Sequence, residues 1–196
     1  MQRQSISARA LSGLTAVALF AGVGCRTVST PETTAAHASL PPAVAPPVIG
    51  KLAGGAPSLD ALVDQFLAAL ADKDLKRLDQ LSVSEAEYRD FILPTSVAPG
   101  QPLKVFPDQP SKYFWDVMNT KSHYWLSSIV AGYGGRKLTR KQIAYALGVQ
   151  EYAGYRAYKK LVITVVNENG EEDRLHTGSV AEADRQYKFI SYLGKD

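Results

Sequence analysis

The side chains that most often carry out chemistry are few in this chain. Its 196 residues include three histidines, His37, His123 and His176, and a single cysteine, Cys25. No two of these residues have the spacing of a shared metal site, and no Gly-x-Ser-x-Gly sequence marks a nucleophilic serine. We therefore expect no metal and no cofactor, and the sequence gives no residue a defined catalytic role.

Cys25 has surroundings that indicate a different chemistry. Arg3 and Arg9 precede an apolar run, residues 10–24, which is shorter than the roughly 20 residues of a membrane-spanning helix. Small residues lead directly to Cys25, with Gly22 where an aliphatic residue is usual. The segment resembles the signal peptide of bacterial lipoproteins, which is cut before a cysteine whose thiol carries diacylglycerol.

This resemblance implies that residues 1–24 are a signal peptide and that lipid on Cys25 anchors the chain to a membrane. In lipoproteins an Asp directly after the cysteine resembles an inner-membrane retention signal. This chain has Arg26 at that position instead. By that analogy the anchor lies in the outer membrane and faces the periplasm. An ordinary signal peptide and an uncleaved anchor are the alternatives.

The charge distribution argues against a nucleic-acid partner. The net charge is +3, but of 22 Lys and Arg residues four lie in residues 1–57, against one of 19 Asp and Glu. The rest of the chain therefore carries 18 of each sign. A domain without net charge lacks the basic surface that a phosphate backbone requires.

Residues 25–57 are predicted to be a lipidated cysteine followed by a disordered tether, because Thr, Ser, Ala and Pro dominate them. A flexible coil of this length spans about 30 Å. A folded domain is predicted over 58–196, and Ser58 is the expected N-cap of its first helix. Apolar residues recur at helical spacing over 59–70.

Three more helices and a strand are expected before the final sheet. Leu75, Leu78 and Leu81 mark the second helix, and a capping box of Ser84 and Glu87 opens a third that ends before Pro94. A long fourth helix is expected from Pro110 to about Ala131. Its predicted apolar side is formed by Phe114, Met118, Trp125, Ile129 and Gly132, and the strand follows at 136–146.

The C-terminal part is predicted to be an antiparallel meander. Strands are expected at 156–168, 171–182 and 186–193. Asn169-Gly170 predicts a two-residue turn with positive φ at both positions. Gly178, inside a strand, indicates either a bulge that bends the sheet or a packing glycine.

This order of elements predicts an α+β layer arrangement. The helix 59–70 with the following Asp72-Lys73-Asp74-Leu75, and the runs 178–180 and 187–192, resemble the nuclear-transport-factor-two-like superfamily. That superfamily shares a cystatin-like cone fold with ketosteroid isomerases and polyketide cyclases. Segment 87–94 also resembles uncharacterised bacterial secreted members. The resemblance implies a cone-like roll of a strongly curved antiparallel sheet, covered by N-terminal helices and one long helix around a pocket.

An acid–base pocket is one consequence of the resemblance. Asp116 and His123 on the long helix, His176 on a strand, and Tyr88 or Tyr113 are the candidates to point inward. None of them aligns with a catalytic position of the isomerases. The simpler interpretation makes His176 a sheet residue and His123 part of the polar flank of a helix.

Aromatic residues offer a second type of site. Aromatic side chains can line a ligand pocket or pack in the core, and core packing is the commoner use. A tyrosine-rich outer face of the sheet would instead suit a homodimer. The residues concerned are Trp115, Tyr124, Trp125, Tyr152, Tyr155 and Tyr158.

The sequence thus favours an envelope lipoprotein whose domain is a non-catalytic module for a small apolar ligand or a protein partner. The first alternative is an enzyme of isomerase or cyclase type that uses a buried carboxylate or histidine. The second is a purely structural component of the envelope. Ligand identity and oligomeric state do not follow from the residues.

Overall fold

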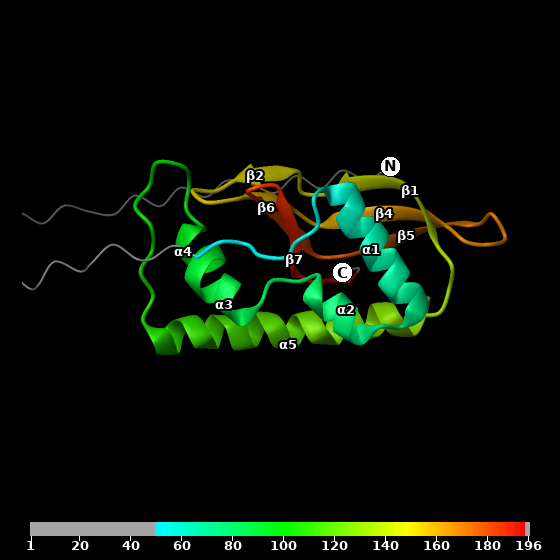
Figure 1. The fold of residues 1–196 in the computed structure, drawn as a ribbon, viewed down its shortest axis with the longest axis horizontal. Helices are drawn as coiled ribbons and strands as arrows, with labels where there is room; N and C mark the ends of the chain where they lie inside the picture. Colours follow the sequence, from blue (N-terminus) through cyan, green and yellow to red (C-terminus); the bar gives the residue numbers. More distant parts are fainter. Residues whose placement is uncertain (1–49, 195–196) are drawn as a thin grey trace, which may run out of the picture. The chain divides into compact units, whose positions relative to one another are not determined.

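Helices precede strands along the chain (Figure 1) in the computed structural model, which describes residues 50–194. The predicted signal peptide, Cys25 and most of the tether lie outside the described residues. Mixed helix and antiparallel sheet confirm the α+β class. The helical segments are α1 (Leu59–Asp72), α2 (Leu75–Gln80), α3 (Glu85–Glu87), the π-helical turn η1 (Tyr88–Ile92), α4 (Leu93–Thr95) and α5 (Asp108–Tyr133).

Local capping signals define the starts of the first helices. The Ser58 side chain accepts the N–H of Ala61 (3.1 Å) at the start of α1. The predicted capping box is present, because Ser84 accepts the N–H of Glu87 and the Glu87 carboxylate accepts the N–H of Ser84. Each bond satisfies a backbone donor that the first helical turn leaves unpaired. The helix starts predicted from these residues are confirmed.

The apolar stripe of α1 forms the centre of the core, as predicted. Leu62, Phe66 and Leu70 are fully buried against the sheet residues Ile163 and Phe189. The helix ends where Lys73 adopts a left-handed conformation at φ 54°.

The third predicted helix does not end before Pro94. The chain passes from α3 through η1 into α4, which includes Pro94 and runs to Thr95. Pro94 has no N–H for the Asp90 carbonyl one turn earlier, and that carbonyl instead accepts the Gly50 N–H (3.1 Å). The Thr95 hydroxyl then donates to the carbonyl of Phe91 (2.6 Å), and the Ser96 hydroxyl donates to that of Ile92 (2.6 Å).

The long helix α5 has 26 residues, so it extends for about 39 Å. Its buried positions are Ser111, Ser122, Leu126 and Ile129. The prediction that Phe114 lies on the buried side is wrong, since 42% of this residue is exposed. Apolar residues occupy both sides of α5, and the sequence period therefore does not identify the inner one.

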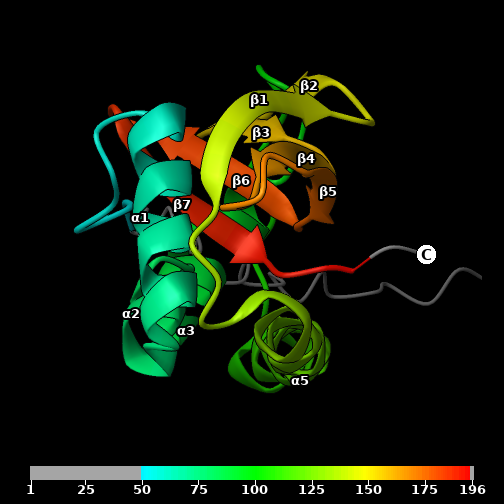
Figure 2. The ribbon, with the colours of Figure 1, turned by 90° about the vertical axis from the view of Figure 1, so that its right-hand side faces the viewer.

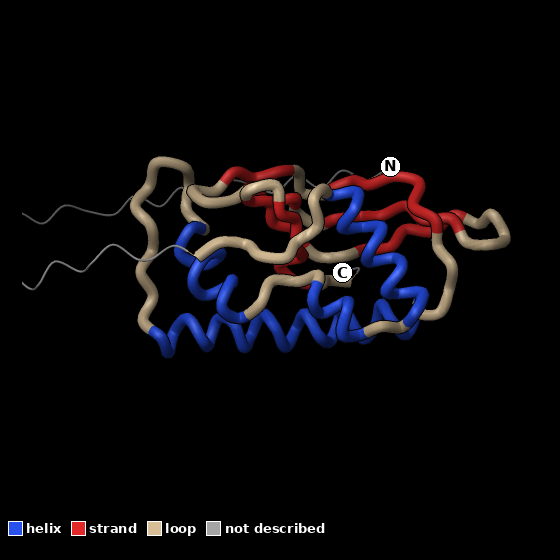
Figure 3. Tube along the Cα trace, viewed as in Figure 1, coloured by secondary structure: helices blue, strands red, loops and turns tan. Residues whose placement is uncertain are grey.

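Within residues 50–194, seven strands form two antiparallel sheets with the orders β1-β4-β5 and β2-β3-β6-β7. The helices α2, α3 and α5 lie along one side of the folded unit and the strands along the other (Figure 3). The strands are β1 (Thr139–Tyr145), β2 (Val149–Glu151), β3 (Arg156–Tyr158), β4 (Leu161–Val166), β5 (Glu172–His176), β6 (Ser179–Ala183) and β7 (Gln186–Ser191).

Two predicted long strands are each interrupted at the same level. Residues 156–168 divide into β3 and β4 at Lys160, which has φ 52°, and residues 171–182 divide into β5 and β6 at Gly178. The Leu161 N–H donates to the Gly178 carbonyl (2.9 Å) across this break. A Cβ atom on residue 178 would lie 1.5 Å from the Ser191 carbonyl oxygen, so only glycine fits.

The hairpin predicted at Asn169-Gly170 is present, but the turn type predicted for it is wrong. At 169–170 only Gly170 has positive φ (80°), and the Asn167 carbonyl accepts the Gly170 N–H to close a three-residue loop. The Asn167 side chain holds this loop by accepting two further backbone N–H groups. The two-residue turn with positive φ at both positions is Asp184-Arg185, between β6 and β7.

The helices α1 and α5 pack against both sheets, and the α3–α4 segment packs against the four-stranded sheet alone. The helix α1 packs beside the strands, and α5 runs below them (Figure 2). One apolar cluster joins α1 and α5 to β4, β5 and β7, and a second cluster joins the α3–α4 segment to β3 and β6.

The residues just before α1 also belong to the folded unit. Ala56 and Tyr187 exchange two backbone hydrogen bonds (3.0 and 2.9 Å), which add residue 56 to the edge of β7. The Gly50 N–H donates to the Asp90 carbonyl (3.1 Å), and Leu52 is buried. Residues 50–57, the last part of the predicted tether, therefore lie against the domain.

Candidate functional site

A groove of about 920 Å³ lies between the C-terminal half of α5 and the three-stranded sheet. All five residues of β5 line it, so the groove follows the terminal strand of this sheet along its length. Its lining from α5 is Trp125, Ser128, Ile129 and Tyr133, and from the other segments Lys141, Gln142, Thr164, Glu172–His176 and Gly194.

The wall formed by α5 is mainly apolar. Ile129 is buried beneath the groove together with Leu175 of β5. Gly194 lies directly on the Trp125 ring, because a Cβ atom there would be 2.2 Å from the indole. These surfaces are suited to an apolar group of a ligand.

Three of the four Lys, Arg, Asp and Glu side chains in the groove are engaged with other groove residues. Lys141 forms an ion pair with Glu172 across the sheet. The Tyr133 hydroxyl donates to the Asp173 carboxylate (3.0 Å). Burial raises the pKa of Tyr133, and the neighbouring carboxylate raises that pKa further. The tyrosine thus remains a hydrogen-bond donor at neutral pH.

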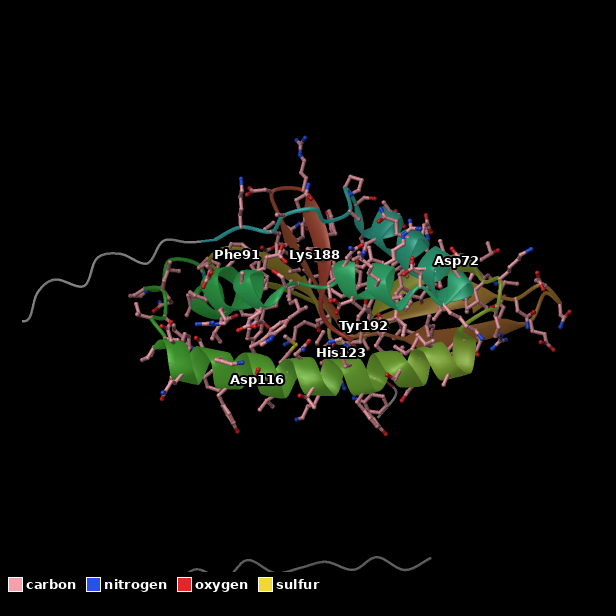
Figure 4. All side chains as sticks on the ribbon, turned by 60° about the horizontal axis from the view of Figure 1, so that its bottom comes forward. Asp72, Phe91, Asp116, His123, Lys188 and Tyr192 are labelled. Carbon is pink, nitrogen blue, oxygen red and sulfur yellow. The ribbon has the colours of Figure 1, made fainter. Side chains whose placement is uncertain are left out.

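A second, polar pocket of about 590 Å³ is lined by the chain before α1, the segment from α2 to α3, the helix α5 and the strand β7. Its lining includes Ala53, Asp79, Ser84, Trp115, Asn119, His123 and Lys188. Lys188 and Glu87 form a buried ion pair beside it (2.7 Å; Lys188 is labelled in Figure 4).

The Glu87 carboxylate is satisfied by several donors. It accepts the N–H groups of Ala53 (2.8 Å) and Ser84 (2.7 Å) as well as the Lys188 ammonium. Burial alone would raise the pKa of Glu87, but these hydrogen bonds outweigh burial and hold the pKa below its ordinary value. The pair is therefore ionised, and it holds the α3 capping box against β7 and the chain before α1.

The structure separates the predicted acid–base candidates. Asp116 is exposed on α5, where it pairs with Lys112 (3.1 Å), and it lines neither pocket (Figure 4). His123 lines the polar pocket, 3.7 Å from Asp79, with both side chains more than half exposed. His176 lines the groove. These three residues do not form one site.

The predicted tyrosines and tryptophans divide in the same way. Tyr88 is half-buried against Trp115 (ring centres 5.6 Å apart), and burial raises its pKa, whereas 65% of Tyr113 is exposed. Trp125 lines the groove, and Trp115 lines the polar pocket. Among the other candidates Tyr152 and Tyr155 stack in the second core cluster, Tyr158 donates to Glu182, and Tyr124 is exposed.

Sequence reasoning missed the Glu87–Lys188 pair and the role of β5. The sequence does contain one signal for the ion pair, because Lys188 interrupts the otherwise apolar and aromatic run 187–190. In the described part of the chain no group of three His, Cys, Asp or Glu residues is placed to hold a metal ion. None of the helices within residues 50–194 has both the length and the apolar character needed to cross a bilayer.

Comparison with known proteins gives no relative from which to infer function. The chain matches no protein-family model, no curated protein and no solved structure.

Proposed function

We propose that this chain is an envelope lipoprotein whose domain is a non-catalytic binding module. The observation that carries the proposal is the groove of about 920 Å³ between α5 and β5. Its volume is within the range of small-molecule sites, and Trp125 and Tyr133 of α5 add apolar surface to a lining that is otherwise largely polar. The ligand is a small apolar molecule or an apolar segment of a protein partner.

The groove geometry favours binding over catalysis. Three of its four Lys, Arg, Asp and Glu side chains have partners within it, because Lys141 pairs with Glu172 and Asp173 accepts the Tyr133 hydroxyl. A catalytic pair would need two titratable groups held beside the same ligand atom. His176 lies in the groove but His123 lies in the other pocket.

The cone-like roll belongs to this proposal as well. The break at Lys160 and Gly178 divides one hairpin between two sheets, and the ladder of β6 and β7 shifts register beside it. Such irregularities bend antiparallel sheets. A strongly curved sheet, closed by α1 and α5, is the architecture that best accounts for the groove beside β5.

Filling the groove provides a direct test of binding. The purified full chain is titrated with the fluorescent apolar probe N-phenyl-1-naphthylamine. Ser128 lines the groove, so Ser128→Trp is expected to weaken binding at least tenfold. Ser127 is exposed and does not line it, so Ser127→Trp is the matched control. Equal effects of the two variants, or no saturable binding, would contradict the proposal.

The membrane anchor is tested independently. Lipid on Cys25 would place the domain on the periplasmic face of the outer membrane, with residues 26–49 between anchor and domain. Labelled palmitate is expected to enter the protein and to be lost in Cys25→Ser. Retention of label in that variant, or fractionation of the wild type with the soluble proteins, would oppose an anchored protein.

An isomerase- or cyclase-type enzyme is the second candidate, and the position of His176 in the groove favours it. Its test is deuterium exchange at the carbon next to the carbonyl of a bound ketone. An enzyme would show exchange that His176→Gln abolishes. Exchange at the solvent rate in the wild type would remove this candidate.

A homodimer through the sheet remains the proposed oligomeric state. Exposed apolar residues occur at the end of β1 (Tyr145), in the following turn (Leu147) and at the start of β2 (Val149), and both strands are outermost in their sheets, which supports it. Light scattering is expected to give a dimer mass that Leu147→Lys reduces to that of a monomer. A monomer mass for the wild type would contradict it.

A further inference from the structure

The strand β5 is an open edge that faces the groove. Among the described residues it has β4 as its only hydrogen-bonded neighbour in the sheet. All five of its residues line the groove, whose opposite wall is α5. A groove bounded by an edge strand and a helix is the setting in which an extended peptide adds to a sheet.

The ladder between β4 and β5 determines which backbone groups face the open edge. At its ends the Asn167 N–H donates to the Glu171 carbonyl (3.0 Å) and the Thr177 N–H donates to the Leu161 carbonyl (2.9 Å). Ladder bonds alternate along an antiparallel strand, so the odd-numbered residues bond to β4. The even-numbered residues, Glu172, Arg174 and His176, direct their N–H and C=O groups to the open edge.

The middle of this edge is covered by a side chain from the same strand. The Arg174 N–H donates to Asp173 Oδ1 (2.7 Å), which agrees with its outward direction, and Asp173 Oδ2 accepts the Tyr133 hydroxyl (3.0 Å). Asp173 thus occupies the position that a backbone acceptor of an added strand would take. A charged side chain of this kind protects an edge strand from uncontrolled pairing.

The side chains beside the edge indicate the chemistry of an occupant. The guanidinium of Arg174 has no ion-pair or hydrogen-bond partner among residues 50–194, although it lies on the groove. An acidic side chain on the occupant would complement it. On the opposite wall, the partly exposed rings of Trp125 and Tyr133 on α5 present apolar surface.

We propose that the groove binds an extended segment of a partner protein as an additional strand on β5, with Asp173 displaced from the Arg174 N–H. Alternate residues of the segment are acidic toward Arg174 and apolar toward α5. This inference depends on the proposed binding function, for which it names the class of partner. The Asp173 carboxylate leaves the Arg174 N–H only when a backbone carbonyl of the bound segment accepts that N–H instead.

The test starts from random ten-residue peptides displayed on phage and selected against the purified full chain. Selected sequences are expected to alternate acidic and apolar residues. A synthetic copy with N-methyl groups on the alternate residues whose N–H groups face β5 loses the edge hydrogen bonds and is expected to bind at least tenfold more weakly. The binding of both peptides is measured by calorimetry.

Variants separate strand addition from contact through side chains alone. Asp173→Ala removes the competitor for the Arg174 N–H and is expected to tighten peptide binding several-fold, and Tyr133→Phe to tighten it less. Arg174→Glu is expected to weaken acidic peptides at least tenfold, with Arg185→Glu, exposed in the β6–β7 turn, as its control.

Three results would overturn the inference while leaving the binding function intact. They are equal binding of the N-methylated peptide, no selected peptide although the apolar probe binds, and blockage of the edge by a second copy of the chain in solution. Failure of the apolar probe together with all peptides would instead contradict the proposed function itself.

Discussion

Glu87 and Lys188 lie 101 residues apart in the sequence and form an ion pair with a 2.7 Å separation. Their side chains are only 9% and 8% exposed. Lys188 also donates to the Ala53 carbonyl (3.3 Å), and Glu87 accepts the Ala53 N–H. The pair therefore connects the start of the described chain, the α3 capping box and β7.

Loss of Glu87 is expected to destabilise the domain more than loss of Lys188. Glu87→Ala leaves a buried ammonium whose remaining partner is one carbonyl, and the expected cost is about 3–5 kcal/mol. Lys188→Met is expected to cost less, because the carboxylate keeps the N–H groups of Ala53 and Ser84. Urea unfolding followed by tryptophan fluorescence measures both free energies. A larger cost for Lys188→Met would contradict this account.

Acid is expected to weaken the domain through the same pair. The pKa of Glu87 is lowered from 4.5, so the folded state resists protonation more than the unfolded chain does. Its contribution is present above pH 4.5 and is lost as the pH falls through the lowered pKa. The unfolding free energy measured from pH 6 to pH 2 should decrease less steeply in Glu87→Gln.

Part of this acid dependence should persist in that variant. Burial opposes ionisation of Glu182, but hydrogen bonds from Tyr158 and Tyr187 and the charge of Arg156 lower its pKa. Glu182 therefore contributes in the same direction. Glu87→Gln with a slope equal to that of the wild type would show that Glu87 is not ionised in the folded state.

Alkaline conditions test a buried tyrosine. Burial raises the pKa of Tyr155 from 10.0 to about 12, although a hydrogen bond with Ser96 opposes part of this shift. A raised pKa contributes stability that is complete below pH 10 and is lost as the pH rises to about 12. Tyr155→Phe should reduce this decrease in the unfolding free energy, and absorbance at 295 nm reports ionisation.

A residual decrease is expected in Tyr155→Phe, because burial also raises the pKa of Tyr192. Tyr113→Phe, at a position that is 65% exposed, is the control and should retain the wild-type curve. If the two variants lost stability identically between pH 10 and pH 12, Tyr155 would not be the group responsible.

Glycine substitutions test the break between the two sheets. A Cβ atom on residue 178 would lie 1.5 Å from the Ser191 carbonyl oxygen, so Gly178→Ala must displace backbone. The expected cost is at least about 3 kcal/mol. Gly132, on α5, has open space around it, and Gly132→Ala should be neutral or stabilise by up to about 1 kcal/mol. Thermal unfolding compares them, and equal effects would contradict the close approach.

Local signals allowed much of the helical part to be predicted. The starts at Ser58 and Ser84 depend on bonds within four residues, and the stripe of α1 has one apolar side. Phe114 was misplaced because α5 is apolar on both sides, with Tyr113 and Val117 outward. The order of the sheets could not be obtained in this way, since it depends on contacts between distant residues.

The candidate site was predictable only in part. Trp125 and His176 were named from the sequence, and both line the groove. The open edge of β5 follows from the order β1-β4-β5, which no local pattern specifies. Asp173 carries no sequence signal either, because its role depends on Tyr133, 40 residues away.

The attachment of residues 50–56 has a mechanical consequence. Tension on the chain from its N-terminal side would load the bonds of Gly50 to Asp90, Ala53 to Glu87 and Ala56 to Tyr187 before it reached α1. A pull on the leading segment would thus be borne by η1, the α3 capping box and β7. The helix α1 and the strand β5 would be shielded from that load.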